Sequence, residues 1–74
     1  MEYVGEHLKE ERIKKKISLN KVSNDLKIGK DIIEEIENDT LPNYLDNVFI
    51  IGHIRSYANY LGLSANEIIS NYKL

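Results

Sequence analysis

The stretch that decides the fold is residues 8–38, LKEERIKKKISLNKVSNDLKIGKDIIEEIEN. Two short groups of apolar residues follow one another in it, each at the three- and four-residue spacing of a helix face. The first group comprises Leu19, Val22 and Leu26, and the second comprises Ile32, Ile33 and Ile36. Ser18 precedes the first group as an N-cap and Gly29 precedes the second. We therefore predict short helices over 19–26 and 30–37, joined by a tight turn.

An N-terminal helix is predicted over residues 3–15. Val4, Leu8 and Arg12 follow one another in it at four-residue steps, so two apolar residues and one cation share a helical face. A cation on a face that packs against the core requires an acidic partner, because an isolated charge is costly to remove from water.

A cluster of turn-forming residues, 38–43, follows the two short helices. Pro42 disfavours helix at the residue before it, and the Asn and Asp residues of the cluster favour turns. The longest helix is predicted after this cluster, over 44–61, with Gly62 as its C-terminal cap. The cluster separates helices and not domains.

The last helix is predicted over 65–71, where Ser64 and Glu67 form a capping-box pair. Five α-helices are thus expected in 74 residues. This length is about half that of a typical domain, so we expect one all-α domain over residues 1–74, with a small core and shallow pockets.

The composition excludes several classes of protein. The chain has no cysteine, which rules out disulfides and thiolate metal sites and favours a reducing, cytoplasmic setting. Hydrophobic residues make up 42% and charged residues 30%, as in ordinary globular proteins. The longest apolar run, Val48 to Ile51, is far shorter than the roughly 20 residues that cross a bilayer. No signal-peptide pattern opens the chain, so we expect this segment to be neither exported nor inserted.

The stretch 8–38 resembles the helix-turn-helix of phage repressors, the Cro and cI class. In that family an arginine late in the first helix pairs with a glutamate near the end of the third, and Arg12 and Glu37 match these positions. The resemblance implies a structural ion pair between them and a lambda-repressor-like five-helix bundle. Ser23 matches the small residue of the second helix, while Lys27 stands where a glycine is usual in the turn.

A resemblance to the RodZ family of bacterial cell-shape proteins covers nearly the whole chain, from VGEHLK at 4–9 to LGLS at 61–64. Its most specific part is GHIRSYANYLGL at 52–63. The resemblance implies a domain that binds the bacterial actin MreB at the cytoplasmic face of the inner membrane. It also implies a downstream linker and a transmembrane helix, neither of which lies within these 74 residues.

The surface with which a repressor-type domain reads bases is acidic here. The start and outward face of the helix predicted over 30–37 carry Lys30, Asp31, Glu34 and Glu35. Three carboxylates in that position would face the phosphates of both strands, so we expect DNA to be an unlikely partner. The alternative function is a repressor-type transcription regulator that reads DNA through these four residues.

Basic residues gather in the first part of the chain. Residues 1–30 have eight Lys or Arg against five Asp or Glu, a balance of +3, whereas residues 31–74 have two against seven, a balance of −5. The run Lys14 to Lys16 lies where the first helix ends, and it has no interleaved aromatic residue for stacking on bases. Four interpretations of this run remain open. It can be a solvated helix end, or it can contact an acidic actin surface, anionic lipid head groups or DNA.

Two stripes are expected on the helix predicted over 44–61. The core stripe comprises Ile50, Ile54, Tyr57 and Leu61, and a second stripe comprises Phe49, His53, Ser56 and Tyr60. At about 100° per residue, the second stripe is centred roughly 120° from the first. Aromatic residues exposed together are typical interface anchors, since rigid rings bury much area with little loss of rotamer freedom.

In the RodZ family the actin-contacting aromatic positions fall on Phe49 and His53. Our leading hypothesis is therefore a partner-binding site with these two residues at its centre and Ile50, Ser56 and Tyr60 around them. Other interpretations of the same residues remain open. They are burial of Phe49 against the connection at 41–42, an ordinary surface role for His53, and weak self-association through the same stripe.

Catalysis and metal binding are not expected. His7 and His53 are the two histidines, and neither has neighbouring ligands at a spacing that suggests zinc. The serines and lysines lack a recognisable base-and-orienter arrangement for nucleophilic chemistry. We predict a protein that is not an enzyme and requires no cofactor.

Overall fold

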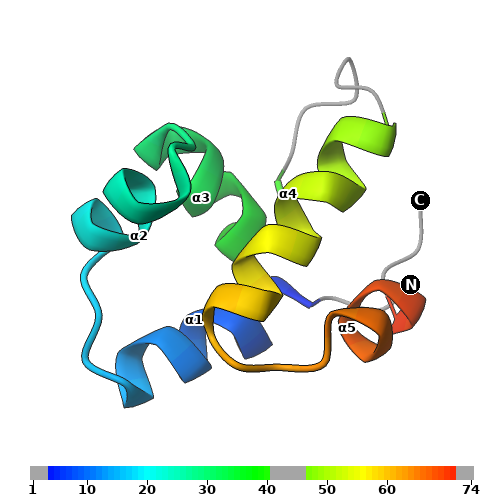
Figure 1. Ribbon diagram of the computed structural model, residues 1–74, viewed down its shortest axis with the longest axis horizontal. Helices are drawn as coiled ribbons and strands as arrows, with labels where there is room; N and C mark the ends of the chain where they lie inside the picture. The colour runs from blue at the N-terminus through cyan, green and yellow to red at the C-terminus, as the bar shows by residue number, and fades with distance from the viewer. Residues whose placement is uncertain (1–3, 41–46, 72–74) are drawn as a thin grey trace.

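A computed structural model of the chain describes residues 4–40 and 47–71. These residues form five α-helices, which confirms the predicted all-α fold with a helix-turn-helix. The helices are α1 (Gly5–Lys14), α2 (Leu19–Leu26), α3 (Lys30–Asn38), α4 (Asn47–Tyr60) and α5 (Ala65–Asn71). α3 packs on α1 and α2, and α4 packs on α2 and α5, so the longest helix occupies the middle of the bundle (Figure 1).

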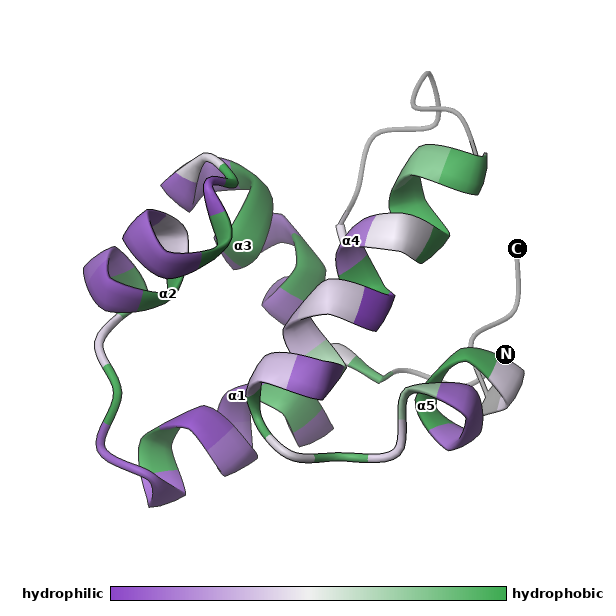
Figure 2. Cartoon of the chain, viewed as in Figure 1, coloured by the Kyte–Doolittle hydropathy of each residue, from purple (hydrophilic) through white to green (hydrophobic). Residues whose placement is uncertain are grey.

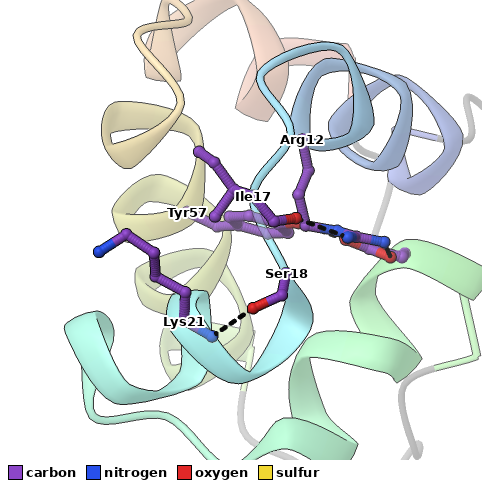
Figure 3. Close-up of polar contacts among 6 residues, drawn as sticks. Arg12, Ile17, Ser18, Lys21 and Tyr57 are labelled. Carbon is purple, nitrogen blue, oxygen red and sulfur yellow. Dashed lines mark hydrogen bonds and ion pairs between the residues drawn. The ribbon is translucent and has the colours of Figure 1, made fainter.

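The helix bounds follow the local capping signals closely. α2 and α5 have the predicted bounds, and α3 ends at Asn38, one residue later than predicted. α1 begins and ends inside the predicted 3–15, and α4 ends at Tyr60. The predicted start of α4 at residue 44 and the turn residues 41–43 lie outside the described residues. The Ser18 hydroxyl accepts from the Lys21 amide at 3.1 Å, the N-cap bond that starts α2 (Figure 3).

A single apolar cluster, drawn from all five helices, forms the core. α4 contributes Ile50, Ile54 and Tyr57 of the predicted stripe, and Leu61 follows its last residue; each is 5% exposed or less. Coloured by hydropathy, the first turn of α4 is also hydrophobic, although it stands at the edge of the bundle (Figure 2). The apolar residues of α4 therefore exceed those that the core takes up.

The first four helices end on the same hydrogen-bond pattern, in which an amide bonds to the carbonyl five residues before it. The bonds are Ile17 N to Arg12 O, Ile28 N to Ser23 O, Thr40 N to Glu35 O and Leu63 N to Ala58 O. In each case the residue before the donor is left-handed, as the motif requires. These residues are Lys16, Lys27, Asp39 and Gly62. Lys27 thus adopts, at φ 60°, the conformation that the usual turn glycine would supply.

The start of α1 lies against the end of α3. A Cβ on Gly5 would stand 2.2 Å from the Ile36 carbonyl oxygen, so only glycine allows this approach. The Asp39 carboxylate then accepts from the Gly5 amide at 3.1 Å, which caps α1 from a residue 34 positions away. Burial raises the pKa of Asp39 above its ordinary value.

Arg12, Glu37 and Tyr57 form a polar network inside the bundle. Nε of Arg12 lies 2.7 Å from Oε2 of Glu37, with side-chain exposures of 11% and 4%. A second guanidinium nitrogen donates to the same carboxylate at 3.2 Å, and the third donates to the Ile17 carbonyl at 2.9 Å (Figure 3). The Tyr57 hydroxyl donates to Glu37 from α4. The structure thus brings Arg12 and Glu37 together and adds a partner that the sequence pattern did not indicate.

The network makes stability depend on pH in the alkaline range. Burial and the hydrogen bond to Glu37 raise the pKa of Tyr57 above the ordinary 10.0. The folded state therefore favours the neutral phenol, so this stabilisation is complete below about pH 10 and is lost at higher pH. We expect Tyr57→Phe to cost about 1 kcal/mol at pH 7, because Glu37 loses a donor. Urea unfolding across a pH series measures this effect. The difference in free energy of unfolding between wild type and Tyr57→Phe should shrink above about pH 10.

Tyr60→Phe is the matched control, because the Tyr60 phenol also donates to a carboxylate but this hydrogen bond is exposed to solvent. Tyr60→Phe should lose nearly as much stability above about pH 10 as the wild type does. If the free energies of unfolding of wild type and Tyr57→Phe change in parallel up to about pH 11, the buried phenol is not the source of the pH dependence.

Candidate protein-binding surface

The first two turns of α4 leave large apolar side chains in solvent. Val48 is 80% exposed and Phe49 is 60% exposed. The exposure of Phe49 does not fit burial against the connection at 41–42, which itself lies outside the described residues. Soluble domains rarely expose neighbouring large apolar residues without a binding role, so this end of α4 is the candidate site.

Phe49 and His53 pack against each other one turn apart. Their ring centroids are 4.9 Å apart with an interplanar angle of 67°, an edge-to-face arrangement. His53 is half-buried, and this burial lowers the pKa of its imidazole below the ordinary value. At neutral pH His53 is therefore an uncharged ring, which can stack or donate a hydrogen bond without bringing a charge into an interface.

The other three predicted contact residues differ in position. Ser56 is exposed beside the two rings. Ile50 is corrected here: it is 5% exposed and belongs to the core, because it lies about 100° round the helix from Phe49. Tyr60 is half-buried, and its hydroxyl donates to Asp25 of α2 at 2.5 Å. The Tyr60 side chain is therefore held against α2 at one edge of the stripe and does not project from it.

We define the α4 surface as Val48, Phe49, Gly52, His53 and Ser56. Over its whole length α4 carries a single charged residue, the exposed Arg55, which lies three residues after Gly52 and therefore borders the α4 surface. Sequence reasoning missed Val48 and Gly52 as members of this surface, since neither fell on the aromatic stripe. The signal that could have found them is that the outward face of α4 carries one charged residue, Arg55, which is fewer than is usual for a surface helix.

The outward face of α3 has the opposite character. Lys30, Asp31 and Glu34 are exposed, and Glu35 is half-buried. One oxygen of the Glu35 carboxylate is buried without a hydrogen-bond partner in the described part of the chain. These side chains stand where a repressor-type domain meets bases and phosphates, so α3 presents mainly negative charge to that side.

The lysines of α1 and α2 are exposed but partly engaged with carboxylates on their own helices. Lys15 lies 3.7 Å from Glu11, and Lys21 lies 3.2 Å from Asp25. Lys21 and Tyr60 together lower the pKa of Asp25, with Tyr60 the larger cause. These pairs reduce the positive charge that the lysines can offer to a polyanion.

Comparison with known families supports the architecture. Residues 7–68 match the model of a helix-turn-helix domain family. The chain belongs to that family. No curated protein and no solved structure gives a significant match. Within this helix-turn-helix domain, α2 and α3 form the motif, with Ser23 of α2 donating to the Ile28 carbonyl at 2.6 Å across the turn.

Two further features of the helix-turn-helix domain concern other kinds of site. No helix in the described ranges is long and apolar enough to cross a membrane. Among residues 4–40 and 47–71, no group of three or more His, Cys, Asp or Glu is placed to hold a metal ion.

The contact between Phe49 and His53 can be measured directly. Because burial lowers the pKa of His53, we expect its imidazole signals to titrate below the ordinary pKa of 6.5 in an NMR pH series. Phe49→Ala removes the covering ring, so the His53 pKa should move back toward 6.5. Ser56→Ala, one turn further along α4, is the control and should leave it unchanged. An unchanged His53 pKa in Phe49→Ala would show that other groups bury the imidazole.

Proposed function

We propose that this helix-turn-helix domain is a protein-interaction module that binds a bacterial actin of the MreB type through the α4 surface. In this role it serves as a cytoskeletal adaptor in cell-shape maintenance at the cytoplasmic face of the inner membrane. The observation that carries the proposal is the exposure of Phe49, 60%, with His53 packed against its ring.

The geometry of the two rings favours a protein partner. Phe49 is held on a 14-residue helix, and His53 restricts its ring from one side, so little rotamer freedom remains to be lost on binding. Burying a large aromatic ring contributes roughly 1.5–3 kcal/mol through the hydrophobic effect. An anchor of this kind fits an apolar pocket on another protein, whereas a charged phosphate backbone offers no apolar pocket for the ring.

The identity of the partner rests on the resemblance to the RodZ family. That resemblance is most specific at 52–63, the part of the chain that also builds most of α4. In the family the actin-contacting positions correspond to Phe49 and His53, both of which belong to the α4 surface. The same resemblance supports a location at the inner membrane, with the membrane anchor outside these residues.

A binding titration with purified MreB tests the proposal. We expect the double substitution of Phe49→Ala and His53→Ala to weaken binding by tenfold or more, because truncating a central aromatic anchor costs about 2 kcal/mol. The free energy of unfolding should change little, since the Phe49 side chain is largely in solvent.

The matched control is Ile13→Ala. Ile13 is the exposed large apolar residue of α1, at 56%, and lies outside the α4 surface. The Ile13→Ala variant should bind MreB with the affinity of the wild type. Unchanged binding by the double variant would assign the interaction to another face, and sedimentation of the domain alone would show whether self-association competes for the α4 surface.

The alternative function is repression of transcription through DNA binding, and the helix-turn-helix and the α1 lysines favour it. The acidic face of α3 opposes it. We expect no mobility shift with random duplex at low salt, and we expect a combined Asp31→Asn and Glu34→Gln variant to gain measurable salt-sensitive DNA affinity. Both substitutions should leave MreB binding unchanged. A salt-sensitive shift by the wild type would favour the repressor function instead.

A further inference from the structure

Arg55 is the one charged residue of α4, and its exposed side chain borders the α4 surface. It lies seven residues after Val48, a spacing that places both on the same side of the helix, about 10 Å apart along its axis. Phe49 lies across Gly52 from Arg55, and Gly52 has no side chain to separate the two. A partner that covers Val48 and Phe49 therefore comes close to the Arg55 guanidinium.

The domain itself uses little of the hydrogen-bonding capacity of this guanidinium. One of its nitrogens donates to the side-chain oxygen of Asn66 on α5 at 3.4 Å, in a solvent-exposed hydrogen bond. Among residues 4–40 and 47–71 no carboxylate forms an ion pair with Arg55. In Arg12, by contrast, every guanidinium nitrogen is bonded within the bundle. A guanidinium has five N–H donors, so most of those of Arg55 remain available to a partner.

A partner seated on Phe49 would change the surroundings of Arg55. It would remove water from the neighbouring side chains, and a guanidinium that loses water without gaining an acceptor destabilises a complex. A basic partner residue at this place would be repelled, and an apolar one would leave the donors unpaired. A carboxylate accepts from two donors at once and supplies the opposite charge.

We propose that Arg55 selects a partner that carries an Asp or Glu side chain beside the apolar pocket for Phe49, and that the two charges pair in the complex. This inference rests on the proposed function and deepens it, since it names the polar contact of the α4 surface. The acidic side chain lies on the bacterial actin, about 9 Å along α4 from the position of Phe49. Phe49 supplies the apolar contact, and Arg55 restricts which apolar pockets are accepted.

Binding of purified MreB across a salt series tests the ion pair. Arg55→Met removes the charge and keeps a long apolar side chain, so we expect binding about fivefold weaker than that of the wild type at low salt. Salt screens charges at the edge of an interface, so the difference should fall below about twofold near roughly 0.5 M salt. Arg55→Glu should bind more weakly still at low salt, because it places two carboxylates opposite each other.

Two control variants separate this role of Arg55 from other effects of the substitution. Lys30→Met removes one exposed positive charge from α3, outside the α4 surface, and should bind MreB with wild-type affinity at each salt concentration. Asn66→Ala removes the hydrogen bond between α4 and α5 but leaves the charge of Arg55 in place. Asn66→Ala should therefore also bind with wild-type affinity.

The results distinguish this inference from the proposed function. Wild-type binding by Arg55→Met and Arg55→Glu, while Phe49→Ala still weakens binding, would overturn the inference and leave the proposed function standing. Equal losses of affinity in Arg55→Met and Asn66→Ala would also overturn it, because the role of Arg55 would then be to hold α5. The same holds for a loss in Arg55→Met that does not change with salt. Binding that neither Phe49→Ala nor any Arg55 variant alters would overturn both.

Discussion

The buried guanidinium of Arg12 is the constraint on which the rest of the structure depends. Its donors reach Glu37 of α3 and the Ile17 carbonyl, and Glu37 in turn accepts from Tyr57 of α4. Taking an ion pair out of water costs several kcal/mol per ion, and the cost is offset only where the remaining polar atoms are satisfied. Here both carboxylate oxygens of Glu37 and all three nitrogens of Arg12 are hydrogen-bonded. One interaction thus fixes α1, α3 and α4 relative to one another.

This constraint also decides which side of α4 faces solvent. Tyr57 must point inward to reach Glu37, and Ile54 shares its side of the helix. At about 100° per residue, Phe49 and Gly52 then lie outside the buried arc. The hydrogen bond from Tyr60 to Asp25 fixes the edge of α4 that meets α2. The α4 surface is therefore a consequence of the polar network inside the bundle, although none of its residues touches that network.

Local signals predicted the helices well, and contacts between distant residues account for what they missed. Ser18 and the paired Ser64 and Glu67 stand at helix starts that the structure places at the predicted residues. Arg12 on an apolar face called for an acid, and Glu37 meets that need. By contrast, the left-handed Lys27 and the close approach at Gly5 depend on neighbouring helices, so residue type alone did not indicate them. Ile50 was predicted both in the core stripe and beside the binding site, and its 5% exposure leaves only the core position.

The two outward faces of the domain differ in charge. Asp31 and Glu34 place negative charge on the face of α3 that would meet a double helix, where repulsion from phosphates acts over about 8–10 Å at physiological salt. α4 carries only Arg55, so its outward face neither attracts nor repels a polyanion strongly. In the proposed function, recognition at Phe49 depends on shape and apolar contact, which are short-ranged and depend on close fit. The proposed function thus assigns to this chain a partner selected by packing, whereas repressor-type domains read DNA by charge and hydrogen bonding.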